Sequence, residues 1–389
     1  MLRRGPALLL SLALLALNVG WVSARLGFLH KPHQVAEHDH LRYLAMARGA
    51  QGDQELARQA PYCWRVAVPA AAAQLARAGL KLNLAFWLLT NVALLAFLLA
   101  LDAWLEALGF GCGERLLGLA LTGLVQGCLR WFEVQYWMTD PAGLALLVLT
   151  LLALRQGRLP LVGALGCAAA FVRETQVVAW PWIFLDRLRA DGLGGALRAT
   201  LLACGPALLV YALLRGLIAP ASGPALHDAI VDNLGFRWRH LLDNQLYLMT
   251  VGTWGVLMPL LLLFPGRLLR VARREPGAVS LLLAVYVTTF LISNNNERPL
   301  AYAVPVVLPA ALLGLRWLSE ASGLSQRTLG SAALLLQLFA WQQALFTGLG
   351  ISVYQPTNRA VLAAMAAAWL AGLWLRRGAP PVTRMLRNL

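Results

Sequence analysis

The densest group of chemically capable side chains follows the first apolar run of the sequence. Four of the six histidines fall between residues 30 and 40, together with two carboxylates in the run Glu37-His38-Asp39. Two carboxylates at this spacing converge on a divalent cation in an extended chain, or one acts as a general base while the other holds a metal or a basic partner. A solvated polar loop is one alternative. Zinc binding by the histidines is another, although their spacing fits no standard zinc pattern.

Further charged residues lie between later apolar runs, where membrane topology gives no reason for them. Arg173-Glu174 separates two short apolar segments, and Glu297-Arg298 follows three asparagines. Such charges favour a water-filled cavity, because exposing a charge to lipid is costly. A planar guanidinium meets two phosphate oxygens at once, so Arg65, Arg173 and Arg298 are candidate phosphate ligands. Local ion pairs that stabilise the turns are the alternative.

A third polar segment, residues 130–140, combines four large aromatic residues with Glu133 and Asp140. Tryptophan and tyrosine form belts at the interface of any membrane protein, so their presence alone carries little functional meaning. The same rings would also stack on a sugar. Asp140 directly precedes Pro141, which predicts that Asp140 caps the start of a helix.

The segments that position these residues are strongly apolar. The chain is 59% hydrophobic and 13% charged, with a mean hydropathy of +0.64. Soluble domains carry about 25% charged residues. Nearly uncharged runs recur along the chain, and most approach the roughly 20 residues that cross a membrane. These runs are 6–22, 82–101, 143–154, 201–218 and 332–349. The sequence therefore predicts an all-α, polytopic transmembrane protein of about 10–12 spans.

The predicted organisation is a single transmembrane domain over residues 1–389. Its first long extracytoplasmic loop covers about residues 24–81 and carries the Glu-x-Asp motif. Within this loop, residues 61–80 are amphipathic and are expected to lie along the outer surface. The first apolar run is expected to be a retained span rather than a cleaved signal peptide. The five cysteines form no Cys-x-x-Cys pair, so they indicate neither a zinc site nor a disulfide framework.

The net charge of +15 comes from arginines at the ends of apolar runs. This distribution matches the positive-inside rule, and it predicts that both termini lie in the cytoplasm. A basic surface for nucleic acid is not needed to explain it, so no nucleic-acid partner is expected. The loops predicted to lie outside carry mixed acidic, basic, histidine and aromatic residues instead.

These motifs resemble the GT-C superfamily, integral membrane glycosyltransferases that use polyprenyl-phosphate-linked sugars. The hallmark of that superfamily is a modified Asp-x-Asp in the first long outer loop, and Glu37-His38-Asp39 matches it. The resemblance extends over the run from Asp39 to Ala45, Pro61-Tyr62-Cys63-Trp64-Arg65 with Pro69, Thr139-Asp140-Pro141, Arg173-Glu174 and Glu297-Arg298-Pro299. The sequence is expected to lack the large soluble C-terminal domain of bigger members, which leaves the choice of acceptor open.

The resemblance implies a role for each motif residue. Asp39 would be the base that deprotonates the acceptor hydroxyl, and Glu37 would orient Asp39 or hold a divalent cation, Mg²⁺ or Mn²⁺, together with it. The substrate-binding residues would be Arg42, Tyr43, Arg65, Asp140, Arg173, Glu174, Glu297 and Arg298. The partners would be a polyprenyl-phosphate-linked sugar, membrane lipid and a glycan, lipid or protein acceptor. The implied reaction inverts the anomeric carbon, and the implied location is the bacterial inner (plasma) membrane.

Three other functions fit the same composition. A transporter or flippase explains the spans, but it predicts charges at mid-membrane depth in broken helices, whereas here they lie mostly at the outer tips. No internal repeat supports a transporter. A polymerase or ligase of lipid-linked glycans shares the chemistry of the transferase, and a non-catalytic membrane subunit is the remaining alternative.

Overall fold

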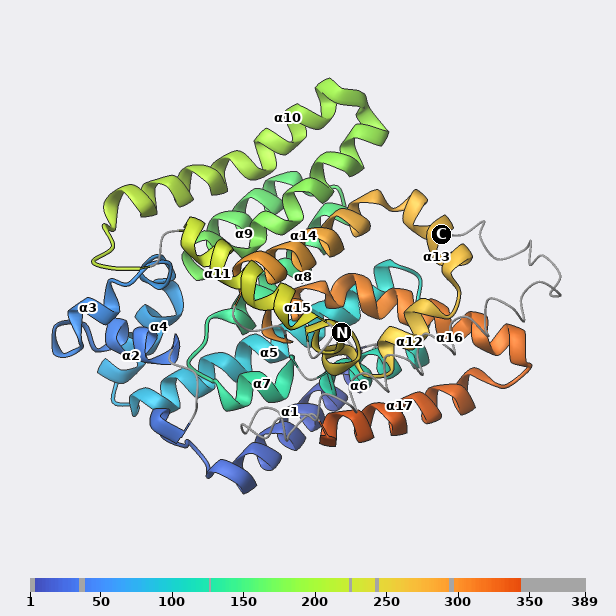
Figure 1. Ribbon diagram of the computed structural model, residues 1–389, viewed down its shortest axis with the longest axis horizontal. Helices are drawn as coiled ribbons and strands as arrows, with labels where there is room; N and C mark the ends of the chain where they lie inside the picture. Colours follow the sequence, from blue (N-terminus) through green and yellow to red (C-terminus); the bar gives the residue numbers. More distant parts are fainter. Residues whose placement is uncertain are drawn as a thin grey trace.

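The computed structural model describes residues 4–34, 39–125, 127–223, 226–241, 245–293 and 297–343 (Figure 1). Within these ranges the chain is built from helices and contains no β-strand, only an isolated parallel bridge between Gln59 and Ser222. The predicted all-α class is therefore confirmed.

The helices occupy most of the described chain. Those before the middle of the chain are α1 (Gly5–Leu26), α2 (Asp39–Arg48), α3 (Gln54–Ala57), α4 (Ala67–Arg77), α5 (Leu82–Ala107), α6 (Cys112–Gly123), α7 (Leu129–Val134), α8 (Asp140–Arg155) and α9 (Leu159–Val172). Those after it are α10 (Trp180–Leu217), α11 (Leu226–Arg239), α12 (Leu257–Leu262), α13 (Pro265–Arg274), α14 (Pro276–Ile292), α15 (Glu297–Leu300), α16 (Val304–Ser322) and α17 (Gln326–Gln343). Short turns include η4 (Tyr62–Trp64) and η5 (Glu174–Ala179).

Four described segments are long and apolar enough to cross a membrane: Gly5–Leu26, Leu82–Ala107, Gln176–Leu217 and Arg298–Ser322. Helices α13 and α14 meet the same test only as a pair bent by 106°, which would make a fifth span. The polytopic prediction is thus confirmed, although the expected 10–12 spans exceed this number. Some predicted spans, such as α8 and α9, are helices of 16 and 14 residues, shorter than the roughly 20 residues that span the hydrocarbon core.

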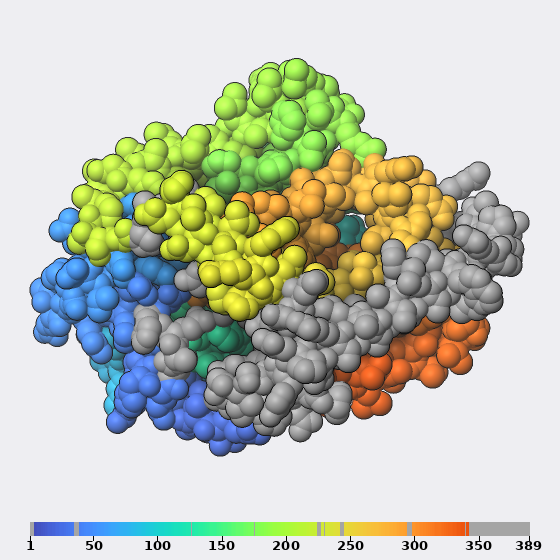
Figure 2. Space-filling view, viewed as in Figure 1, coloured from blue at the N-terminus to red at the C-terminus, as the bar shows by residue number. Residues whose placement is uncertain are grey.

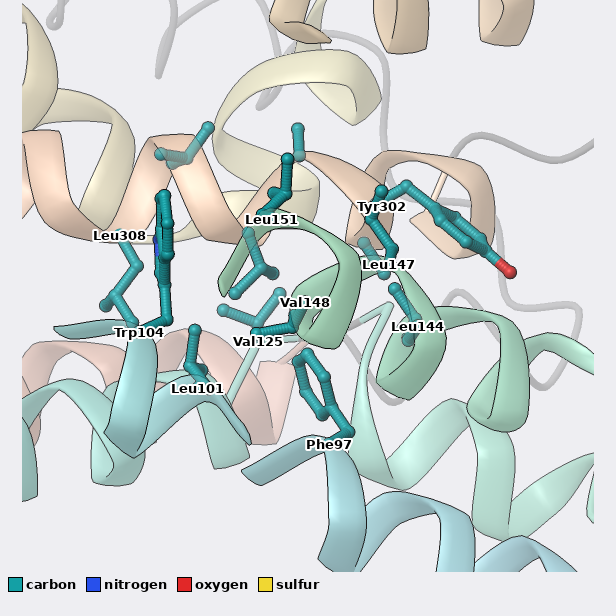
Figure 3. Close-up of a cluster of buried hydrophobic side chains, with 14 of the residues drawn as sticks. Phe97, Leu101, Trp104, Val125, Leu144, Leu147, Val148, Leu151, Tyr302 and Leu308 are labelled. Carbon is teal, nitrogen blue, oxygen red and sulfur yellow. The ribbon is translucent and has the colours of Figure 1, made fainter. Parts of the chain in front are cut away.

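The centre of the molecule lies where α5, α8 and α16 meet. Of the 18-residue apolar stretch of the span that contains α16, 83% is buried inside the protein. The corresponding share is 28% in the span that contains α10. Figure 3 shows the side chains of this centre, with Phe97 of α5 facing residues of α8 and Trp104 of α5 beside Leu308 of α16. The indole of Trp104 donates to the carbonyl of Pro305 at 2.9 Å, which ties α5 to the start of α16.

Close packing, rather than removal of apolar surface from water, holds helices together in lipid. Gly314 illustrates this on α16, because a Cβ there would lie 2.1 Å from the carbonyl oxygen of Leu260 on α12. The absence of a side chain lets the two backbones approach.

Helix α10 lies at the periphery and forms the upper edge of the molecule in Figure 2. Leu201 is 69% exposed and Leu217 is 80% exposed, and Leu208, Leu209 and Leu213 between them are also exposed. A contiguous apolar surface of this kind fits contact with lipid. Helix α10 combines two helical stretches across a kink, and the predicted run 201–218 falls in the second stretch, which ends at Leu217. The helix is bent at Gly192, whose φ of +70° is open to glycine without strain (Figure 1).

The loops predicted to be cytoplasmic meet at one end of the bundle. Ion pairs join the start of α1 to the end of α5 (Arg4–Glu106, 3.6 Å) and the end of α8 to the start of α14 (Arg155–Glu275, 3.5 Å). Arg267 of α13 pairs with Glu320 of α16 at 2.9 Å. Helix α2 lies at the opposite side of the molecule from α13 in Figure 1.

Candidate functional site

Four segments that are distant in sequence bring the predicted site residues together. Helix α2 begins at Asp39, and η4 follows it in the first long loop. Helix α8 begins at Asp140, with Pro141 in its first turn. Arg173 ends α9 in an extended conformation that turns the chain into η5. Arg298 lies on the short α15.

The carboxylate of Asp39 accepts hydrogen bonds from three donors. Arg298 donates through Nη1 to Oδ2 at 2.9 Å. The hydroxyl of Tyr62 donates to Oδ1 at 2.6 Å, and Nη1 of Arg42 donates to the same oxygen at 3.2 Å. The guanidinium of Arg42 also lies over the Tyr62 ring, 4.5 Å from its centroid, and donates to Gln59. Asp39 is therefore held by groups from both the first loop and α15.

Arg65 and Glu174 form a second centre beside the first. Arg65 is only 5% exposed, and it binds both carboxylate oxygens of Glu174, with Nε to Oε2 at 2.9 Å. Its Nη1 donates to the hydroxyl of Tyr43 at 2.9 Å. That hydroxyl lies 3.5 Å from the hydroxyl of Thr139, so the pair is linked to the start of α8.

Asp140 forms the third centre and is fully buried. Its Oδ2 accepts a hydrogen bond from Arg173, and its Oδ1 lies 3.8 Å from Nε of Arg298. The hydroxyl of Tyr302 donates to the backbone carbonyl of Asp140 at 3.3 Å. The predicted capping role of Asp140 is wrong: the residue before α8 is Thr139, with no side-chain cap, and the Asp140 carboxylate binds Arg173 instead.

Arg298 joins the first and third centres, because it contacts both Asp39 and Asp140. The described network therefore includes Asp39, Arg42, Tyr43, Arg65, Asp140, Arg173, Glu174 and Arg298, every predicted site residue whose side chain the structure describes. Within it, four arginines face three carboxylates, which leaves one positive charge in excess. Glu37 lies outside the described residues, and the side chain of Glu297 lies outside the described side chains.

The surroundings fix the charge of the two best-described carboxylates. Burial raises the pKa of Asp39, but the charge of Arg298 and the hydrogen bond from Tyr62 outweigh it, so the pKa lies below its ordinary value. For Glu174, burial likewise raises the pKa, and the charge and hydrogen bonds of Arg65 lower it by more. Both groups are therefore ionised at neutral pH.

A divalent cation does not fit the described surroundings of Asp39. Both of its oxygens accept from arginine or tyrosine donors, and cationic donors repel a metal ion. Among the described residues, no group of three or more histidine, cysteine, aspartate or glutamate side chains is arranged to hold a metal. The second expected ligand, Glu37, lies outside those residues.

Of the four aromatic residues of 130–140, Phe132, Tyr136 and Trp137 pack inside the protein, and Trp131 is partly buried. Tyr136 and Trp137 are at most 1% exposed, and their rings lie 3.9 Å apart. Tyr136 donates to the carbonyl of His30 at 2.8 Å, and the His40 ring lies 5.1 Å from Trp137. These rings join the first loop to the second, and their burial leaves no face of Tyr136 or Trp137 for a sugar.

Three residues of the network were not predicted as site residues from the sequence. Tyr62 donates to Asp39, Gln59 accepts from Arg42, and Thr139 contacts Tyr43. The segment around Tyr62 resembled the family motif, but nothing in its spacing indicated that its hydroxyl meets Asp39, 23 residues away.

In comparisons with known proteins, no family model matches the chain, and a search of curated proteins finds no match.

Proposed function

We propose that the protein is a membrane glycosyltransferase that moves a sugar from a polyprenyl-phosphate donor to a hydroxyl of a glycan, lipid or protein acceptor. One observation carries the proposal: Asp39, a carboxylate ionised at neutral pH, lies in one network with Arg65, Arg173 and Arg298. Such a network offers a proton acceptor for the nucleophile and cations for an anionic leaving group.

In the proposed reaction, the acceptor hydroxyl replaces the hydroxyl of Tyr62 at Oδ1 of Asp39. The acceptor oxygen forms a bond to the anomeric carbon as its proton passes to Asp39. The bond from that carbon to the phosphate oxygen breaks, and the electron pair leaves with the polyprenyl phosphate. Arginine stabilises the charge that develops on the leaving phosphate.

Arg298 would couple the two halves of this reaction. It lies 2.9 Å from Asp39 and 3.8 Å from Asp140, so it is shared between two carboxylates. A donor phosphate competes for the same guanidinium. When Arg298 turns to that phosphate, Asp39 loses the charge that most strongly lowers its pKa and becomes a stronger base.

The proposed orientation sets the arginine-rich end of the bundle in the cytoplasm, by the positive-inside rule. The site would then face the periplasmic or outer side of a bacterial inner membrane, with both termini cytoplasmic. Arg155, Arg267 and Arg274 lie at the arginine-rich end and support this orientation.

The test is transfer of radiolabelled sugar from a panel of polyprenyl-phosphate sugars by purified protein in lipid. The parent is compared with Asp39→Asn and with Asp228→Asn, a control carboxylate whose side chain is 68% exposed on α11. Transfer by the parent and by the Asp228 variant, but not by Asp39→Asn, supports the proposal. Equal transfer by both variants would refute the role of Asp39, and no transfer from any donor to any offered acceptor would count against the enzyme.

A further inference from the structure

Arg215, in the last turn of α10, differs from the four arginines of the network. Its guanidinium lies over two aromatic rings, 3.7 Å from the centroid of Tyr211 and 4.4 Å from that of Trp64. Its Nη2 donates to the hydroxyl of Tyr211 at 2.8 Å. Its Nη1 is buried and has no hydrogen-bond partner, and no described carboxylate pairs with this side chain.

This environment favours an anion. Ring faces hold a guanidinium by cation–π attraction but do not replace hydrogen-bond acceptors in its plane, so the buried Nη1 keeps its donor capacity unused. A cation that has lost part of its water and has no carboxylate beside it gains more from an anionic ligand than a paired cation does. The planar fork of Nη1 and Nη2 suits the oxygens of a phosphate.

The position of Arg215 connects lipid with the candidate site. On its own helix, Leu213 and Leu217 are 53% and 80% exposed. On the other side, Trp64 directly precedes Arg65, and the Trp64 indole donates to the carbonyl of Ile218 at 3.0 Å. Tyr211 lies within electrostatic range of both Arg65 and Glu174.

We propose that Arg215, supported by Trp64 and Tyr211, binds the phosphate of a polyprenyl-phosphate lipid that reaches the site along the exposed face of α10. The apolar tail would lie against the leucines of α10, and the group beyond the phosphate would point towards Arg65 and Asp39. The inference rests on the proposed function for the identity of the lipid. The recognised chemistry is a phosphate on an apolar chain, which ordinary phospholipids also carry.

The test is direct binding of radiolabelled polyprenyl phosphate, without a sugar, to full-length protein in phosphatidylcholine nanodiscs. The parent is compared with Arg215→Gln and with Arg198→Gln, which removes an exposed arginine from the same helix. The parent and Arg198→Gln are expected to bind equally, and Arg215→Gln about tenfold or more weakly, as befits loss of a charge-assisted contact of roughly 1.5–3 kcal/mol. Polyprenol, which lacks the phosphate, should bind all three alike.

Equal binding of polyprenyl phosphate by the parent and Arg215→Gln would overturn the inference, as would no binding by the parent. Arg215→Lys keeps the charge without the planar fork and should bind with intermediate affinity, so it replaces the glutamine variant if that one fails to fold. Competition on the parent by phosphatidylglycerol tests the lipid class. If phosphatidylglycerol displaces the labelled polyprenyl phosphate at the same concentration as unlabelled polyprenyl phosphate does, the assignment to a polyprenyl carrier is overturned.

The two proposals fail separately. Binding that depends on Arg215, without sugar transfer from any donor, keeps the phosphate site and refutes the transferase. Sugar transfer by the parent, with binding unaffected by Arg215→Gln, keeps the transferase and refutes the phosphate site.

Discussion

Removing one partner of the Arg65–Glu174 pair should destabilise the protein far more than removing a surface charge. Arg65 is 5% exposed and binds both oxygens of Glu174, so Glu174→Gln leaves a buried guanidinium without its counter-charge. Breaking a fully buried pair in this way costs about 3–5 kcal/mol. The Glu174 side chain is 27% exposed, and water reaching it reduces the expected loss to about 2–4 kcal/mol.

The assay is equilibrium unfolding in mixed micelles, with tryptophan fluorescence as the signal and the free energy of unfolding as the result. The control is Glu275→Gln, which removes a partner of Arg155 at 3.5 Å, where both side chains are at least one-third exposed. An exposed pair of this kind contributes about 0–1 kcal/mol.

A double-mutant cycle separates the pair from other effects. Arg65→Gln combined with Glu174→Gln removes both charges, so the double variant should lose less stability than the two single variants added together. Strict additivity, or a loss for Glu174→Gln no greater than for Glu275→Gln, would refute the idea that this pair is coupled and buried.

The remaining predictions concern catalysis and pH. Asp39→Asn should lower the transfer rate by about 10²–10⁴-fold, the typical contribution of a general base, while Glu37→Gln should impair it less. Tyr62→Phe removes the donor at 2.6 Å, so the pKa of Asp39 in the free enzyme should rise, and the acid limb of the pH profile of kcat/KM, which reports the free enzyme, should move to higher pH. Burial raises the pKa of Glu133 from 4.5 to about 7, so the folded state retains a proton that the unfolded state releases. Stability should therefore fall by about 3 kcal/mol as the pH rises from about 4.5 to about 7, and Glu133→Gln should abolish this fall in pH-dependent unfolding.

Matched variants make these outcomes interpretable. Tyr247→Phe removes a tyrosine hydroxyl distant in sequence from the network and should leave the pH–rate profile unchanged. Glu55→Gln, on an exposed position of α3, should leave the pH dependence of unfolding as in the parent. An unchanged acid limb in Tyr62→Phe, or a pH-dependent fall that survives in Glu133→Gln, would contradict the respective assignment.

The residues of the network could largely be predicted from the sequence, because charge at the end of an apolar run is costly and therefore informative. Arg173 and Arg298 stood out for this reason, and both lie in the network. Their partners could not be predicted. The contact between Asp39 and Arg298 spans 259 residues and depends on how helices dock, which hydrophobic periodicity does not encode.

The same limit explains the differences in the fold. Apolar content finds membrane helices, but it does not reveal that Gly192 adopts a non-helical conformation with positive φ where the two stretches of α10 meet. Nor does it separate an interfacial aromatic residue from a packed one, so Tyr136 and Trp137 could not be recognised as buried links between loops. The importance of Arg215 arises from two ring contacts, one of them to Trp64 in a distant loop.

The long separation between Asp39 and Arg298 has a consequence for biosynthesis. At about 5–20 residues per second, the ribosome needs roughly 13–50 s to reach Arg298 after Asp39 has been made. During that time the first loop has its local partners, Arg42 and Tyr62, but not the arginine that reaches it from α15. The nascent chain therefore carries an incomplete site through most of its insertion. A chain truncated before α15 would retain the leading helices and lack this assembled centre.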